Sequence, residues 1–253
     1  DWDRAVACVG QERAATVTFA DVFPEEAVIA FAPAALDGPA PDSAQRAFRQ
    51  RLAAYEAQHP TPADFDPDNL RQLINHETFV NRDAYVHSGW LAYFLRRYGI
   101  PVRRQTDLLE QAITQEDAGA VAVLLDHGFI IAARQLRVAA TTKARSDAAR
   151  ERNRHHHGLD EHGDPLFYDE SKSTIRTILD QLTARYGDAT VADPDGYVNV
   201  RKQPGTAAAV VGRVTNGETI AVLDNTGSWW RIETSTGTRG FIFENRVALR
   251  QRR

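Results

Sequence analysis

The chain has 253 residues, of which 43% are hydrophobic and 25% are charged, and its formal net charge is -4. No apolar run approaches the roughly 18 to 20 residues of a membrane-spanning helix, so a membrane span is excluded. The negative net charge argues against nucleic acid as the main ligand. A single cysteine rules out an internal disulfide and a cysteine-rich metal finger. These counts indicate an ordinary globular protein with one large domain or two smaller ones.

The start of the chain bears on its compartment. The sequence contains no methionine and opens on charged residues at Asp1. We expect that a signal peptide has been removed and that the protein is periplasmic or secreted, which fits the near absence of cysteine. A cloning boundary explains the same start, and the sequence leaves that alternative open.

Residues 1–66 are predicted to form a helical N-terminal region. Asp42 or Ser43 is suited to cap a helix that runs to about Gln58, with Phe48 and Leu52 on its apolar face. The proline-containing run 59–62 ends this helix, and a further helix is expected from Pro67 onward.

Residues 67–190 show helices that end in glycine. The runs 89–99 and 119–128 are amphipathic and close on Gly99 and Gly128, 29 residues apart. The run 106–113 lies between them as a further helix, and the run 175–187 closes on Gly187 about two periods later. A glycine after each helix can adopt the left-handed conformation that turns the chain toward the next unit.

The best of these units, residues 106–128, resembles an ankyrin repeat, with a T-P-L-H-x-A-like first helix and a V-x-x-L-L-x-x-G-like second helix. It departs from that pattern at Asp107, which replaces the turn proline, and at residues 117–120, which replace the Gly-His turn between the helices. The resemblance implies a stack of helical repeats. An unrelated helical array with glycine caps is the alternative.

The composition changes near residue 190. Residues 187–196 are rich in glycine, aspartate and proline and read as a linker. From Asp195 onward the chain has nine basic and five acidic residues, a net charge of +4, whereas the preceding part has 21 basic and 29 acidic residues, a net charge of -8. An acidic large domain is therefore followed by a basic small one.

Short runs of β-branched and aromatic residues fill the C-terminal part. Strands are expected at 197–201, 210–214, 220–223, 229–232 and 240–243, with a hairpin-type turn at Asn216-Gly217. Gly240 is expected where a close approach of strands or a bulge needs it. The inward positions are assigned to Val198, Val200, Val210, Val214, Ile220 and Val222.

This pattern resembles a bacterial SH3-like domain over residues 195–249, which implies a small barrel of short strands. The predicted fold class is therefore α+β and multidomain: a helical, ankyrin-like array followed by a small SH3-like β-barrel. The expected domains are the helical region 1–66, the ankyrin-like repeats 67–190 with a histidine-rich loop insert, and the SH3-like domain 195–249.

Catalytic signatures are missing from the sequence. It has no G-x-S-x-G, no phosphate-binding loop and no H-E-x-x-H, and Cys8, the only thiol, lies in an apolar helical context. We therefore predict that the protein is not an enzyme, that it has no catalytic residue and that it needs no cofactor.

The histidine-rich run 154–164 is the one candidate metal site. His155, His157 and His162, with nearby aspartates, are ligand types that suit zinc or nickel. A metal-dependent enzyme built on this loop is one alternative function, and a solvated loop inserted in the repeat array explains the run equally well.

The adjacent Trp229 and Trp230 must face opposite sides of a strand, so one ring belongs to the core and the other points outward. The outward ring, with Tyr197, Asn199 and Phe243, would form an aromatic groove for a peptide or glycan. The alternative is that these rings pack against the helical domain. In the repeat array, loop tips and the concave face bind partners, so the tip candidates are Tyr85, His87, Arg103, Arg104 and His127.

The resulting function is a non-catalytic bacterial envelope binding protein whose partner is another protein. Its most concrete form is an immunity protein or inhibitor that occludes a toxin or effector. A peptidoglycan-binding tether acting through the SH3-like groove is the first alternative, and the metal-dependent enzyme is the second.

Overall fold

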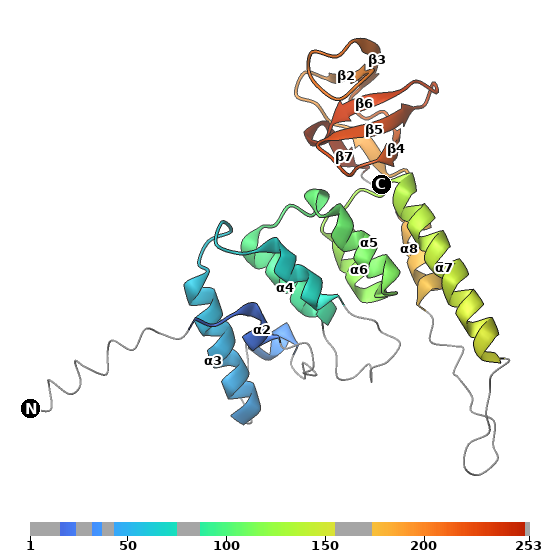
Figure 1. Ribbon diagram of the computed structural model, residues 1–253. Helices are drawn as coiled ribbons and strands as arrows, with labels where there is room; N and C mark the ends of the chain where they lie inside the picture. The colour runs from blue at the N-terminus through green and yellow to red at the C-terminus, as the bar shows by residue number, and fades with distance from the viewer. Residues whose placement is uncertain (1–15, 24–31, 37–42, 75–86, 155–173, 251–253) are drawn as a thin grey trace, which may run out of the picture. The chain divides into compact units, whose positions relative to one another are not determined.

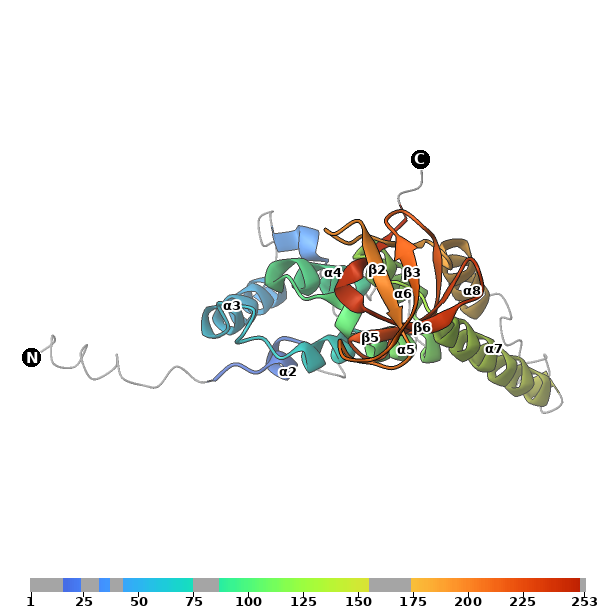
Figure 2. The ribbon, with the colours of Figure 1, turned by 90° about the horizontal axis from the view of Figure 1, so that it is seen from above.

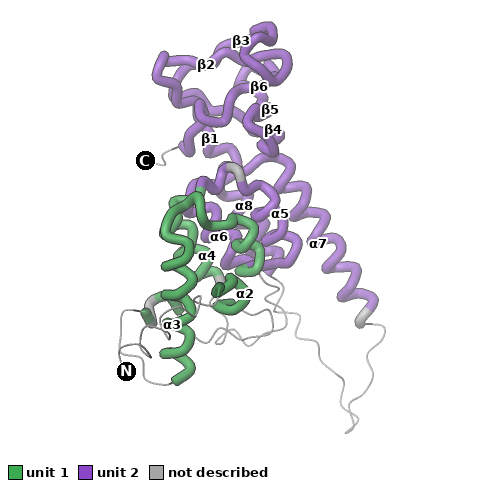
Figure 3. The backbone as a smooth tube through the Cα atoms, turned by 60° about the vertical axis from the view of Figure 1, so that its left-hand side comes forward, with its two compact units in different colours: residues 1–73, 81–100 green, residues 74–80, 101–253 purple. Residues whose placement is uncertain are grey.

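The computed structural model describes residues 16–23, 32–36, 43–74, 87–154 and 174–250, shown in Figure 1 and, from above, in Figure 2. In these ranges helices precede strands. The chain divides into two compact units, residues 1–73 with 81–100 and residues 74–80 with 101–253 (Figure 3). No helix in these ranges has the length and hydropathy that crossing a membrane requires.

Unit 1 is built from short helices around an aromatic core. Its elements are α2 (Phe19–Val22), η1 (Pro33–Leu36), α3 (Ser43–Gln58), η2 (Pro67–Leu73) and α4 (His87–Tyr98). The helix predicted from residue 43 to about 58 is confirmed as α3, whereas the helix expected from Pro67 is the 3-10 helix η2.

The core of unit 1 is packed with rings. The ring of Phe94 contacts several other rings. Its centroid lies 5.3 Å from that of Phe19, 5.6 Å from that of Phe65 and 6.1 Å from that of Tyr98. Edge-to-face and offset pairs at such separations are the favoured arrangements of aromatic side chains. The fully buried members of this core are Tyr55, Leu70, Leu73, Trp90, Leu91, Phe94 and Tyr98.

Unit 2 begins with helices. These are η5 (Val102–Arg104), α5 (Thr106–Thr114), α6 (Ala118–Asp126), α7 (Ala133–Arg154) and α8 (Ile175–Arg185). α5 packs on α6 and α7, and α8 packs on α6 and α7. Asp117 caps α6, because its side chain accepts a hydrogen bond of 2.8 Å from the backbone N–H of Ala120.

The predicted glycine turns are confirmed. Gly99, Gly128 and Gly187 have φ angles of 57°, 91° and 85° just beyond α4, α6 and α8. α5 and α6, with nine residues each, are the helix pair that resembles an ankyrin repeat, whereas α7 has 22 residues. The described helices of unit 2 therefore differ in length, unlike the helices of a regular repeat. The ankyrin-like array stays a prediction.

The strands of unit 2 form two antiparallel sheets. β2 (Tyr197–Arg201), β3 (Val210–Thr215), β4 (Ile220–Asp224), β5 (Trp229–Thr234) and β6 (Arg239–Phe243) make a five-stranded sheet in the order β3-β2-β6-β5-β4. β1 (Ala189–Val191) pairs with β7 (Val247–Leu249), which follows the 3-10 helix η7 (Glu244–Arg246).

The five-stranded sheet is not closed, which corrects the expected barrel. β3 and β4 stand at its two ends. β1 contacts the turn that connects β3 to β4 in sequence. The N–H of Val191 donates to the carbonyl of Glu218 at 3.1 Å, and the N–H of Gly217 donates to the carbonyl of Val191 at 2.9 Å. Residues 189–191, expected in a linker, form a strand because they pair with β7, and the backbone of Val191 is also satisfied by the turn.

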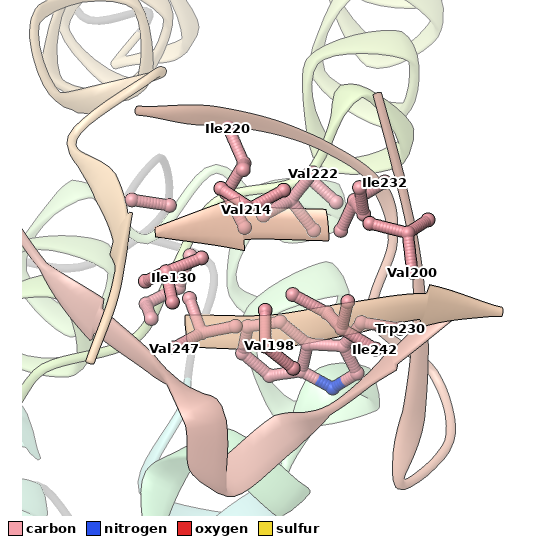
Figure 4. Close-up of a cluster of buried hydrophobic side chains, with 13 residues drawn as sticks. Ile130, Val198, Val200, Val214, Ile220, Val222, Trp230, Ile232, Ile242 and Val247 are labelled. Atoms are coloured by element: carbon pink, nitrogen blue, oxygen red, sulfur yellow. The ribbon is translucent and has the colours of Figure 1, made fainter. Parts of the chain in front are cut away.

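The core of the sheet draws residues from both halves of unit 2 (Figure 4). Trp230, Ile232, Ile242 and Val200 are fully buried within it. Ile130 and Ala132, from the segment between α6 and α7, belong to the same buried cluster. The sheet therefore completes its core with side chains from the helical part of unit 2.

Val210 corrects the predicted inward set. Val198, Val200, Val214, Ile220 and Val222 are buried as predicted, but Val210 is 52% exposed. The register of β2 with β3 shifts between Val200 and Arg201, so Arg201 lies opposite Val210 and Val211 is the extra residue. The extra residue shifts the alternation of inward and outward side chains by one position, so Val210, on the far side of the bulge from Gly212, faces outward with Arg201.

A polar network joins the same two halves. The Asn225 amide donates to the carbonyl of Ile130 at 2.7 Å and accepts from the Gln135 amide at 3.2 Å. Gln135 also donates to Glu110 at 3.1 Å, and Arg134 pairs with Glu110 at 2.6 Å. The hydrogen bond that the Arg134 guanidinium donates to Glu110 raises the pKa of this guanidinium. Asn225 and Gln135 are buried, so each depends on these partners.

Candidate binding surface

The two faces of the five-stranded sheet have different chemistry. Along β2, β5 and β6 buried residues alternate with more exposed ones. We call the more exposed side of these three strands the outer face. Its side chains are Tyr197, Asn199 and Arg201 from β2, Trp229, Arg231 and Glu233 from β5, and Arg239, Phe241 and Phe243 from β6.

The two adjacent tryptophans lie on opposite sides, as predicted. Trp230 is fully buried in the sheet core, and its indole N–H has no hydrogen-bond partner among the described residues. Trp229 is half-buried on the outer face, opposite Phe243 in the β5–β6 ladder, and their rings meet edge to face at 5.5 Å. Trp229 and Phe243 can therefore contact a ligand, whereas Trp230 stabilises the core.

The other two expected groove residues lie on β2. The guanidinium of Arg213, on the neighbouring strand β3, lies 4.0 Å from the ring centroid of Tyr197. This is a close cation–π contact. Asn199 is half-buried and lies opposite Arg213 in the β2–β3 ladder. The expected groove residues thus share a face with arginines.

Arginines are the part of the outer face that the sequence did not single out. Arg201 lies opposite Phe241, and Phe241 lies opposite Arg231, so an arginine, a phenylalanine and an arginine follow one another across β2, β6 and β5. Directly paired residues project to the same side of a sheet. The available signal was an arginine in three of the predicted strands, at Arg201, Arg213 and Arg231, but the pairing register was needed to bring Arg201 and Arg231 into one row.

The loop-tip candidates do not join this face. The Arg103 guanidinium donates to the carbonyl of Val247 at 2.6 Å, and the His127 ring nitrogen Nδ1 lies 2.8 Å from the carbonyl of Val123. The His127 contact is local, whereas the Arg103 contact joins the helical part of unit 2 to β7, 144 residues further along the chain. Tyr85 lies outside the described residues, and the side chains of His87 and Arg104 are outside them too.

The metal candidates cannot be placed. His155, His157 and His162 lie outside the described residues, as does Cys8. Within the described ranges no group of three or more histidine, cysteine, aspartate or glutamate side chains is arranged to hold a metal ion.

A family match covers the sheet. Residues 196–248 match the model of a family described as the bacterial SH3 domain. A search of curated proteins finds no match. The matched residues include β2 to β6 and the first two residues of β7, and they exclude β1. The match supports a role for this part of the chain in binding the cell wall or another protein.

Proposed function

We propose that the chain is a non-catalytic bacterial binding protein of the cell envelope whose outer face binds another protein. The single observation that supports this most is the combination of aromatic and arginine side chains on the outer face. Aromatic residues and arginine are enriched in protein–protein interfaces and dominate their binding energy. The family match to residues 196–248 agrees with a binding role.

The exposure of these side chains fits an interface. Arg231 and Arg213 are exposed, while Trp229, Phe241 and Phe243 are half-buried and so retain area that a partner can cover. Half-buried rings are already restricted by their neighbours, so binding costs them little rotamer freedom. The narrower form, an immunity protein or inhibitor that occludes a toxin or effector, belongs to this proposal as one kind of protein partner.

A peptidoglycan-binding tether is the second candidate. The observation that favours it is the edge-to-face pair of Trp229 and Phe243, because exposed rings also stack on sugars and on wall peptides. In that case the helical part of the chain would recruit a further partner.

Affinity capture tests the proposal. The purified chain is used as bait against bacterial envelope extract and, separately, against purified sacculi, with Trp229→Ala as the test variant. Tyr186→Ala, a half-buried aromatic residue just beyond α8 in the same unit, is the matched control.

A stoichiometric protein that is retained by the wild type and by Tyr186→Ala but lost by Trp229→Ala supports the protein-binding function. Retention of sacculi alone with the same pattern establishes the tether instead. Capture that Trp229→Ala leaves unchanged rejects the outer face as the binding surface.

A further inference from the structure

We infer that the outer face takes an acidic peptide segment, with carboxylate groups pairing with Arg201 and Arg231 and an apolar group packing on Phe241 between them. This inference rests on the proposed function, in which the outer face binds another protein. It adds the chemistry of the partner and the residues that select it.

The register places these residues in one row across four strands. Val210 on β3 lies opposite Arg201 on β2, Arg201 opposite Phe241 on β6, and Phe241 opposite Arg231 on β5. We call these four residues the arginine–phenylalanine row. Neighbouring strands lie about 4.8 Å apart, so the two arginine backbones are roughly 10 Å apart. The 52% exposure of Val210 extends the apolar surface at the β3 end of the row.

Among the described residues, neither arginine of the row has a carboxylate partner. The Arg201 guanidinium donates to the backbone carbonyl of Ala208 at 2.7 Å, which does not neutralise its charge. Arg231 is exposed and forms no ion pair within the described ranges. Both guanidinium groups can still donate two parallel hydrogen bonds to a carboxylate.

The nearby acidic groups are engaged elsewhere. Glu233 pairs with Arg239 at 2.5 Å on the same face. Asp224 lies opposite Arg231 in the β4–β5 ladder, but its carboxylate accepts hydrogen bonds from the N–H of Thr226 at 3.0 Å and from the Thr226 hydroxyl at 2.9 Å. Arg213, stacked on Tyr197, adds a further positive charge beside the row.

These charges select the partner. A positive row attracts an acidic segment and repels a basic one, which raises the association rate for the right partner and excludes the wrong one. The phenylalanine between the arginines favours a peptide that alternates acidic and apolar groups over a uniformly charged polymer.

Selection from a random peptide library tests this inference. The whole chain is used as bait for displayed dodecapeptides, in three forms: the wild type, the double variant Arg201→Gln with Arg231→Gln, and the control Arg137→Gln with Arg250→Gln. The control removes the same charge from exposed arginines on α7 and beyond β7. Circular dichroism confirms that all three forms are folded.

The expected result is that the wild type selects peptides enriched in aspartate and glutamate over the starting library. A synthetic copy of the best peptide should bind the row variant about a hundredfold more weakly, roughly tenfold for each arginine, because each charge-assisted pair is lost. The control variant should bind within about threefold of the wild type, since exposed charges away from the site act only at long range.

The other outcomes separate the two proposals. Selected peptides without acidic enrichment, or acidic peptides that bind the row variant as tightly as the wild type, overturn the inference and leave the protein-binding function intact. No selection above background by the wild type overturns both.

Discussion

Asn225 is the residue whose replacement should most clearly separate the sheet from the helices of unit 2. It directly follows β4, is 2% exposed and connects the sheet to the segment between α6 and α7. Its amide donates to the carbonyl of Ile130 at 2.7 Å and accepts from Gln135 at 3.2 Å. Asn225→Ala removes both hydrogen bonds at once.

The expected cost follows from what each partner retains. Gln135 keeps its hydrogen bond to Glu110 at 3.1 Å, so its side-chain nitrogen loses one of two acceptors, and its side-chain oxygen still accepts from the N–H of Ala132 at 2.8 Å. The carbonyl of Ile130 loses the Asn225 donor in a buried environment, which costs about 1 to 3 kcal/mol. Adding the second lost hydrogen bond at about 1 kcal/mol gives a loss of about 2 to 4 kcal/mol in the free energy of unfolding of unit 2.

Hydrogen exchange measured by mass spectrometry is the assay, because it reports on each segment separately. Amides in β4, β5 and the first turns of α7 should all exchange faster in Asn225→Ala, by about one and a half to three orders of magnitude where exchange requires opening of the unit. The matched control is Asn199→Ala on the outer face, which should change the stability by less than about 0.5 kcal/mol.

Unchanged protection in Asn225→Ala, or faster exchange confined to the strands, would refute the reasoning. The first result would mean that the network contributes nothing to stability. The second would mean that the sheet opens independently of the helices.

Three further predictions concern packing and pH. Gly240→Ala should lower the melting temperature by several degrees, because a Cβ at residue 240 would lie 2.6 Å from a backbone oxygen of β2. The control Gly227→Ala, whose Cβ would have no atom within 4 Å, should leave the melting temperature unchanged. Thermal denaturation of both variants checks this, and equal melting temperatures would contradict it. Trp230→Ala should cost about 3 to 5 kcal/mol in urea denaturation because the ring is fully buried, and Trp229→Ala should cost much less, so a reversed order would exclude the assigned core. Burial raises the pKa of the Tyr55 phenol to about 12, so the folded state favours the neutral phenol. The contribution of this group to the free energy of unfolding is complete below the pKa of an unfolded tyrosine, about 10, and is lost as the pH rises from about 10 to about 12. The difference in tyrosinate absorbance between the wild type and Tyr55→Phe, followed with circular dichroism, should appear only as the pH approaches 12. A difference near pH 10 in the folded protein would be inconsistent with the burial of Tyr55.

Local patterns were sufficient to predict several elements. The helix α3, the glycines after α4, α6 and α8, and the strands of the C-terminal sheet follow from residues close together in sequence. Gly240 was also predicted correctly as a position of close approach, since a Cβ at this residue would meet Val200 and the backbone of Arg201. Such features depend on backbone geometry over a few residues.

Long-range pairing set the limit of prediction. Ile130 enters the sheet core from the segment between α6 and α7, far away in sequence, and the run 189–191 becomes β1 because β7 pairs with it. The row of Arg201, Phe241 and Arg231 likewise exists only through the ladder register. Sequence patterns show that β2, β3, β5 and β6 each contain an arginine, but they do not show which of these residues become neighbours.

Site-specific photo-crosslinking tests the central claim that the outer face binds a partner. Phe241 is replaced by p-benzoyl-phenylalanine, which keeps the ring in its place between the arginines, and the exposed Ala140 on α7 is replaced in the same way as the control. The chain is irradiated in envelope extract. The account predicts one protein adduct from position 241 and none of that mass from position 140. An adduct from position 140 alone would place the binding surface on the helices and contradict the account.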